Sequence, residues 1–166
     1  MAFPDDAVEV RAQGWRALAA FHGLIDSALE TALQKEAGLS VVEYTVLDVL
    51  SRQVGVHHLR MQQVARATAL SSSATTRLVA RLERRGLLAR FLCVDDRRGI
   101  YTELTDAGAR LLDQARPTHD ATLRAALDQA KNTPELSQFV QVIDFGYDTQ
   151  YGVDTVLDPT RTASTR

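Results

Sequence analysis

The chain has 166 residues, of which 45% are hydrophobic and 24% charged, and its formal net charge is -2. These values are typical of one globular domain of ordinary size and exclude a fibrous or largely disordered chain. No run approaches the roughly eighteen apolar residues of a membrane span, and the acidic start is unlike a signal peptide, so we expect a cytoplasmic protein without membrane contact. The single cysteine, Cys93, excludes an internal disulfide and a cysteine-only zinc site.

The first predicted element is a long helix from Asp6 to Lys35. Its apolar residues recur at spacings of three and four in two adjacent stripes, so more than one side of the helix is buried. In a chain this short, we expect the second side to contact a partner chain. The two stripes consist of Trp15, Leu18, His22, Ile25, Leu29 and Ala32, and of Phe21, Leu24, Ala28 and Leu33.

A second, shorter helix follows Gly38, which supplies the usual stop signal. Ser40 and Glu43 have the spacing of a capping box, in which each side chain bonds the backbone at the other residue. The helix ends near Ser51, and the stretch from His57 to Leu59 is predicted as an extended connection.

Two helices separated by a tight turn come next, from Met61 to Thr68 and from Ser71, a good N-cap, to about Arg85. This spacing predicts a helix-turn-helix. Gly86 ends the second helix, and strand-like runs at 88–94 and 100–104 flank a turn-rich segment. We therefore expect a β-hairpin directly after the helix-turn-helix.

The last predicted elements are helical. Thr105 caps a helix from Asp106 to Arg116, which Pro117 breaks or kinks; a helical stretch follows to Lys131, and Pro134 begins another helix. Without periodicity after Gly146, the end of the chain is expected to be a mobile tail. The predicted fold class is mainly α with a small β-hairpin wing, in which a winged helix-turn-helix lobe joins a helical dimerisation region.

The charge distribution points to nucleic acid. Between Arg60 and Gly99 there are nine arginines and three acidic residues, a net charge of +6, so the remainder carries -8. A basic module within an acidic chain suits a protein of which only one face meets phosphate.

The second helix of the motif should enter the major groove, where short polar side chains and arginine can reach base edges. Arg77 is the candidate for base reading and Arg81 for positioning on the backbone. At the hairpin tip, Arg98 is the candidate for the minor groove, and Asp96 would pair with an arginine to shape the tip. The predicted DNA-binding residues are Ser72, Ser73, Thr75, Thr76, Arg77, Arg81, Asp96, Arg97 and Arg98.

Simpler interpretations exist for each feature. The hydroxyls are also explained by ordinary helix capping, and the charged tip by a solvated turn. A winged helix used only for protein contacts is the competing binding class, although it needs neither the arginine tip nor the polar helix start. No glycine-rich phosphate loop, nucleophile elbow or paired carboxylate supports an enzyme, and no cofactor or metal is expected. Adjacent His57 and His58 lack ligand spacing, and a redox role for Cys93 has little support.

Several motifs together resemble the MarR family of winged-helix regulators over roughly Trp15 to Leu127. They are Val64-Ala65, Thr76-Arg77-Leu78-Val79, Arg81-Leu82-Glu83, Gly86-Leu87, Asp96-Arg97-Arg98, Leu104-Thr105 and Gly108. The resemblance implies a homodimer that binds a pseudo-palindrome in double-stranded DNA. Ser72 to Arg81 would form the recognition helix, and Asp96 and Arg98 the characteristic pair of the wing.

The resemblance also suggests a division of the chain and a ligand site. Residues 1–37 would form a dimerisation helix, 38–104 the DNA-binding lobe, 105–146 the helices that complete the dimer, and 147–166 the tail. Many members bind small aromatic acids where the first two helices meet the lobe, which makes Trp15, His22 and Tyr44 candidate pocket residues for an aromatic or phenolic ligand. We expect a ligand-responsive repressor; a constitutive regulator without a ligand remains open.

Overall fold

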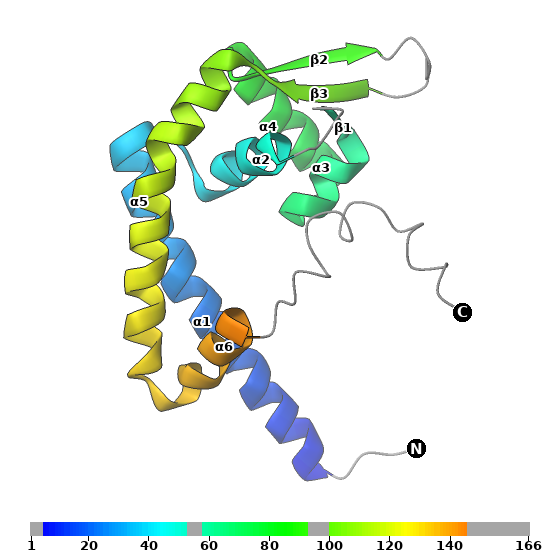
Figure 1. The fold of residues 1–166 in the computed structure, drawn as a ribbon. Helices are drawn as coiled ribbons and strands as arrows, with labels where there is room; N and C mark the ends of the chain where they lie inside the picture. The colour runs from blue at the N-terminus through cyan, green and yellow to red at the C-terminus, as the bar shows by residue number, and fades with distance from the viewer. Residues whose placement is uncertain (1–4, 53–57, 93–99, 146–166) are drawn as a thin grey trace, which may run out of the picture.

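The computed structural model describes residues 5–52, 58–92 and 100–145 (Figure 1). Six helices and three strands occupy these ranges. In chain order they are α1 (Asp5–Ala37), α2 (Val41–Ser51), β1 (His58–Arg60), α3 (Met61–Thr68), α4 (Ser72–Arg84), β2 (Leu88–Leu92), β3 (Ile100–Leu104), α5 (Asp106–Lys131) and α6 (Pro134–Phe145). The predicted tail, 147–166, lies outside the described residues.

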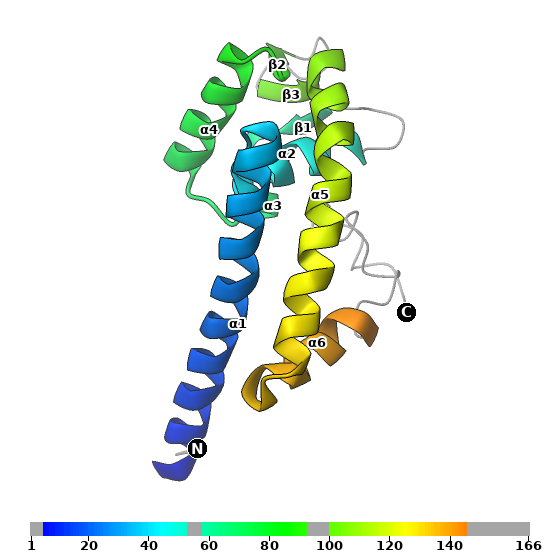
Figure 2. The same cartoon turned by 90° about the vertical axis from the view of Figure 1, so that its left-hand side faces the viewer.

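The molecule has two parts. The lobe consists of α2, α3, α4 and the three strands, and it sits at one end of the stalk, which consists of α1, α5 and α6. Figure 2 shows α1 and α5 running side by side away from the lobe, with α6 folded back at the far end. The mainly helical fold class with a small wing is confirmed.

Local sequence signals set the helix ends. The Ser40 hydroxyl accepts from the backbone N of Glu43, and the Glu43 carboxylate accepts from the backbone N of Ser40, which confirms the capping box. Ser71 and Thr105 cap α4 and α5 in the same way, by accepting from Ala74 N and Gly108 N. These three predicted helix starts are therefore correct.

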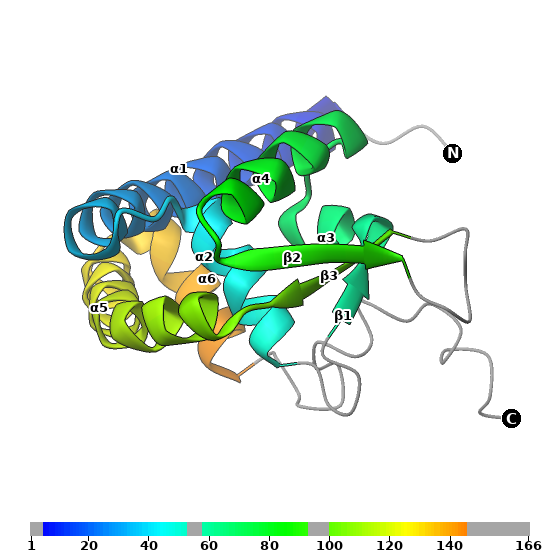
Figure 3. The same cartoon turned by 90° about the horizontal axis from the view of Figure 1, so that it is seen from above.

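The sheet has three antiparallel strands in the order β1, β3, β2 (Figure 3). β2 and β3 form the predicted hairpin, with Leu88 opposite Leu104. The stretch before α3, predicted as an extended connection, is a third strand, because Leu59 pairs with Thr102 and the Thr102 hydroxyl donates to the Leu59 carbonyl at 3.1 Å. This third strand joins the hairpin to the start of the helix-turn-helix.

The main core fills the lobe and continues between α1 and α5. Its fully buried side chains include Leu33, Leu47, Leu82 and Leu112, which come from both parts of the molecule. A smaller cluster lies in the stalk, where Phe21 and Phe139 pack with ring centroids 5.5 Å apart. The upper stalk and the lobe are thus one packed unit.

α5 is one helix of 26 residues with Pro117 in its interior, so of the predicted break or kink the break does not occur. A proline removes one backbone hydrogen bond, which a long helix tolerates when tertiary packing holds both sides. Here Leu112 and Ala115 are buried before Pro117, and Ala126 and Ala130 after it. Within the described ranges, no helix is long and apolar enough to span a membrane.

Candidate nucleic-acid interface

The turn between α3 and α4 has a defined geometry. Ala69 adopts the left-handed conformation with φ of 53°, and the backbone N of Leu70 donates to the carbonyl of Ala65 at 3.1 Å. Such a closure is the usual way to end a helix and redirect the chain within two or three residues. It brings Ser71 into place as the N-cap of α4.

α4 has one buried face and one exposed face. Its buried residues are Thr75, Leu78, Val79 and Leu82, at the spacing of a single helical stripe. The exposed residues on the remaining surface are Ser72, Ser73, Thr76, Arg77, Arg81 and Arg84. The helix therefore presents hydroxyls in its first turns and arginines along its length.

Thr75 requires a correction, because it was expected among the exposed DNA-binding residues. Only 1% of it is exposed, and its hydroxyl donates to the carbonyl of Ser71 at 3.0 Å. The reason is its position one turn before Val79, in the stripe that packs into the lobe. Thr75 cannot reach a base edge without leaving the core.

The two candidate arginines differ in their surroundings. Arg77 is exposed and makes no ion pair with the described residues. The Arg81 Nε donates to a carboxylate oxygen of Glu43 at 2.7 Å, and half of the Arg81 side chain stays exposed. Arg77 is thus available to a base or a phosphate, whereas Arg81 is anchored to α2.

Glu43 is a residue that sequence reasoning assigned only to capping. Its other oxygen lies 3.2 Å from the Arg85 guanidinium, so two arginines share one carboxylate. Burial raises the pKa of Glu43, but the hydrogen bond from Ser40 and the charges of Arg81 and Arg85 outweigh it, so that the pKa lies below its ordinary value. The carboxylate is therefore ionised at neutral pH.

The base of the wing is tied to α4. Arg90 on β2 donates to Glu83, and this pair raises the pKa of Arg90 and lowers that of Glu83. Across the hairpin, the rings of Phe91 and Tyr101 stack with centroids 6.0 Å apart. These contacts give the wing a fixed direction relative to α4. The predicted tip residues Asp96, Arg97 and Arg98, together with Cys93 and His57, lie outside the described residues.

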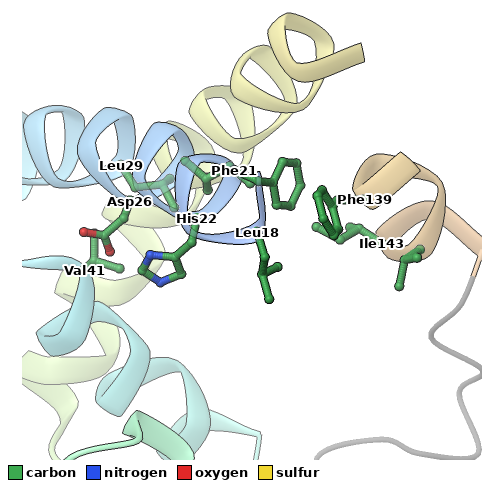
Figure 4. Close-up of a pocket in the computed structure, with 10 residues that line it drawn as sticks. Leu18, Phe21, His22, Asp26, Leu29, Val41, Phe139 and Ile143 are labelled. Atoms are coloured by element: carbon green, nitrogen blue, oxygen red, sulfur yellow. The ribbon is translucent and has the colours of Figure 1, made fainter. Parts of the chain in front are cut away.

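An apolar pocket of about 390 Å³ lies between α1, α6 and the start of α2 (Figure 4). Figure 4 shows Phe21 and Phe139 facing each other at one end, and Leu18 and His22 pointing into the space. Further lining comes from Ile25, Asp26, Leu29, Val41, Val142 and Ile143. A volume of this order suits a small organic molecule.

The structure does not bring the three predicted pocket residues together. His22 lines the pocket, but Trp15 and Tyr44 do not. Tyr44 is buried in the core, where it stacks on His119 with centroids 4.3 Å apart, and burial raises its pKa to about 12. Trp15 is 70% exposed on α1. Among the residues in the described ranges, no group of His, Cys, Asp and Glu could hold a metal ion.

Comparisons with known proteins identify the family. The model of the MarR family matches residues 37–99, which include the helix-turn-helix and the first strand of the wing, β2. The HTH-type transcriptional regulator YkoM of Bacillus subtilis (strain 168) is 30% identical over 120 residues, which are 72% of this chain and 75% of YkoM. The chain belongs to the MarR family. It is a DNA-binding transcriptional regulator.

Solved MarR-family structures share the fold over most of the chain. The regulator Sco3205 from Streptomyces coelicolor, solved in complex with DNA, is 28% identical with a TM-score of 0.68, over 88% of this chain and 91% of Sco3205. CouR from Rhodococcus jostii RHA1, solved with p-coumaroyl-CoA, is 30% identical with a TM-score of 0.60, over 79% of this chain and 91% of CouR. The arrangement of lobe and stalk is thus common to MarR-family structures from more than one organism.

Proposed function

We propose that this MarR-family protein is a cytoplasmic, sequence-specific repressor that binds a pseudo-palindromic operator as a homodimer and acts by binding rather than by catalysis. The observation that carries the proposal is the exposed face of α4. There Arg77, without an ion pair among the described residues, stands beside Ser72, Ser73 and Thr76 on a helix whose opposite face is closed in the core. Short hydroxyls and one long arginine at the start of a helix suit the major groove.

The remaining predicted DNA contacts have two different roles, one at the DNA backbone and one in the minor groove. Arg81 would meet the DNA backbone, since half of its side chain is exposed while its Nε is held by Glu43. The wing tip with Asp96, Arg97 and Arg98 would reach the minor groove, as the sequence suggests. Sco3205, a related regulator, was solved in complex with DNA, which supports DNA as the partner.

A homodimer is supported by the stalk. Several large apolar side chains are exposed there, among them Val8, Trp15 and Leu18 on α1 and Ile143 on α6. An apolar surface of this kind marks a contact with another chain. A two-fold dimer would place two lobes on half-sites about one helical turn apart, roughly 34 Å. In this division, residues 1–37 and 105–146 form the dimer and 38–104 bind DNA.

Ligand response is supported by the pocket. It lies where α1 and α6 meet Val41 at the start of α2, at the junction of stalk and lobe. CouR, a related regulator, was solved with an aromatic acyl thioester, p-coumaroyl-CoA. A small aromatic or phenolic acid bound in the pocket would release DNA if it favours a different spacing of the two lobes.

Arg77→Ala tests the operator contact. We expect operator affinity to fall by about 1–3 kcal/mol, because a bidentate base contact is lost, and affinity for random DNA to change little. Arg124→Ala is the matched control, since Arg124 is an exposed arginine on the stalk helix α5. Fluorescence anisotropy with an operator selected from genomic fragments measures both. Unchanged operator binding in Arg77→Ala would remove α4 as the reading element.

Two alternatives have distinct outcomes. A set of phenolic acids that never releases DNA would favour a constitutive regulator over a ligand-responsive one. If no genomic fragment binds more tightly than random DNA, a winged helix that contacts only proteins becomes the better interpretation.

A further inference from the structure

Glu43 is the only charged side chain that is buried in the part of the chain that the structure describes, and 3% of it is exposed. It lies in the first turn of α2, and its two oxygens receive three partners. The backbone N of Ser40 donates at 2.9 Å, Arg81 Nε at 2.7 Å, and the Arg85 guanidinium lies at 3.2 Å. Every partner stabilises the ionised form.

The two arginines come from one end of α4. Arg81 lies in its last turn, and Arg85 is its C-cap. Arg85 also donates to the carbonyl of Gly38 at 3.0 Å, in the corner between α1 and α2. Figure 2 shows α4 beside the end of α1 from which the chain continues into α2. Glu43 and Gly38 therefore hold the C-terminal end of α4 against the corner.

Capping alone does not explain a charge at this position. A capping box works equally well with glutamine at the third helical residue, because only an acceptor oxygen is needed. A buried carboxylate costs several kcal/mol unless cations and hydrogen bonds compensate for it, and that cost is unnecessary for capping. Beyond the Ser40 N–H, what compensates the buried charge is the pair of guanidinium groups of Arg81 and Arg85, both at the C-terminal end of α4.

We propose that Glu43 is a positioning residue for operator recognition, whose buried carboxylate fixes Arg81 and Arg85 and thereby sets the orientation of α4 relative to the α1–α2 corner. This inference rests on the proposed function, in which the first turns of α4 read the operator. If the orientation of α4 is fixed, its exposed hydroxyl groups and Arg77 meet the base edges of the operator in one arrangement. This orientation matters less for non-specific binding, which depends on the number of cations near phosphate.

Glu43→Gln tests this role, because glutamine keeps the size and the cap but removes the charge. We expect operator affinity to fall about tenfold, comparable with one mismatched base pair. Affinity for random DNA should stay equal or increase, since one negative charge beside two arginines is lost. The ratio of the two affinities is the readout, because partial unfolding would lower both affinities together. An unchanged ratio in a folded Glu43→Gln dimer would overturn the proposal.

Asp48→Asn is the matched control on the same helix. Asp48 also binds two arginines, Arg52 at 2.7 Å and Arg116 at 2.7 Å, but Arg116 belongs to α5 and neither lies on α4. We expect its loss to leave the affinity ratio unchanged. A fall in the ratio equal to that of Glu43→Gln would show that any broken ion pair on α2 has this effect, which also overturns a specific role for Glu43.

Two further variants keep the outcome clear. If Glu43→Gln folds poorly by circular dichroism, Arg85→Gln removes the Arg85–Glu43 ion pair at a partly exposed side chain and should lower the ratio of the two affinities as well.

Arg77→Ala, measured in parallel, distinguishes a failure of the proposed operator contact from a failure of the positioning role. If Arg77→Ala leaves operator binding intact, the proposed reading face is wrong. If Arg77→Ala weakens operator binding while Glu43→Gln and Arg85→Gln keep the wild-type ratio of operator affinity to random-DNA affinity, only the positioning role is wrong.

Discussion

The lobe and the stalk differ in which side chains they leave at the surface. Among the described residues, the exposed large hydrophobic side chains lie on α1 and α6, apart from Ile100 in the wing. The stalk members are Val8, Val10, Trp15, Leu18, Val142 and Ile143. The lobe buries its apolar residues in the core that it shares with α1 and α5, and exposes arginines instead. The lobe is thus complete as a single copy, whereas the stalk surface suits a second chain.

The lobe and the stalk also differ in which elements their ion pairs join. In the lobe, ion pairs join different elements: Glu43 joins α2 to α4, and Glu83 joins α4 to β2. In the stalk, the pair between Arg16 and Glu9 lies within one helix and is 63% exposed on each side. Exposed pairs contribute little. Between stalk helices, Lys131 on α5 lies 3.6 Å from Asp144 on α6, at side chains that are 51% and 39% exposed. We infer that ion pairs contribute more to the arrangement of the lobe than to that of the stalk, where the pairs are more exposed.

The largest expected effect comes from the stalk. Leu18→Asp places a charge on the exposed face of α1, so we expect a monomeric mass by light scattering at micromolar concentration. Operator affinity should fall by about 100-fold or more, because two linked lobes bind far more tightly than one. Ile100→Asp, at an exposed apolar position of the lobe, is the control and should remain dimeric. A dimeric Leu18→Asp protein would show that the partner covers another surface.

Next in size is a packing effect where the lobe meets the stalk. A Cβ at Gly108, in the first turn of α5, would lie 2.0 Å from the Leu87 carbonyl oxygen and 2.8 Å from Leu104. We expect Gly108→Ala to lower the free energy of unfolding by about 1–3 kcal/mol, measured by urea denaturation.

The control for Gly108→Ala is Gly23→Ala on α1, where a Cβ meets nothing within 4 Å. Alanine favours a helix by about 1 kcal/mol over glycine, so this variant should be as stable as the wild type or more so. Equal losses at both positions would contradict the distinction between a crowded junction and an open stalk face. A loss at Gly23 alone would indicate that a partner chain packs there.

The sequence predicted most accurately the features that depend on residues close together in the chain, such as helix bounds and caps. The bounds of α3, Met61–Thr68, and the caps at Ser40, Ser71 and Thr105 were correct, because capping and helical periodicity involve residues three or four apart. The order of helix-turn-helix and wing was also predictable from these signals.

The features that the sequence did not predict depend on contacts between residues far apart in the chain. Glu43 meets Arg81 only after the lobe has folded, and its capping role left nothing in the sequence unexplained. Thr75 is polar, and its burial follows from the stripe that it shares with Val79 and Leu82. α5 continues through Pro117, with buried residues on both sides of the proline that the local sequence signal does not reveal. Trp15 and Tyr44 do not line the pocket, since Trp15 is exposed on α1 and Tyr44 stacks on His119 in the core.

A smaller effect is expected in the free energy of unfolding at acidic pH. The pKa of Glu43 in the folded protein lies below its ordinary value of 4.5, so its contribution to stability is fully present above that pH and is lost as the pH falls through the folded value. The unfolding free energies of the wild type and Glu43→Gln should therefore differ by a constant amount near neutral pH and converge below pH 4.5. A difference independent of pH would mean that glutamine disturbs packing rather than charge.

The smallest expected effect is spectroscopic and concerns Trp15, the single tryptophan of the chain. In one copy of the protein Trp15 is 70% exposed, so acrylamide should quench its fluorescence strongly in a monomer. If a second copy covers this face of α1, dilution through the dimer dissociation range should raise the quenching constant and shift emission to longer wavelength. Leu18→Asp should give the monomer values at every concentration. Quenching that stays constant while light scattering reports dissociation would place Trp15 outside the interface, and would restrict the dimer contact to other exposed residues of α1 and to α6.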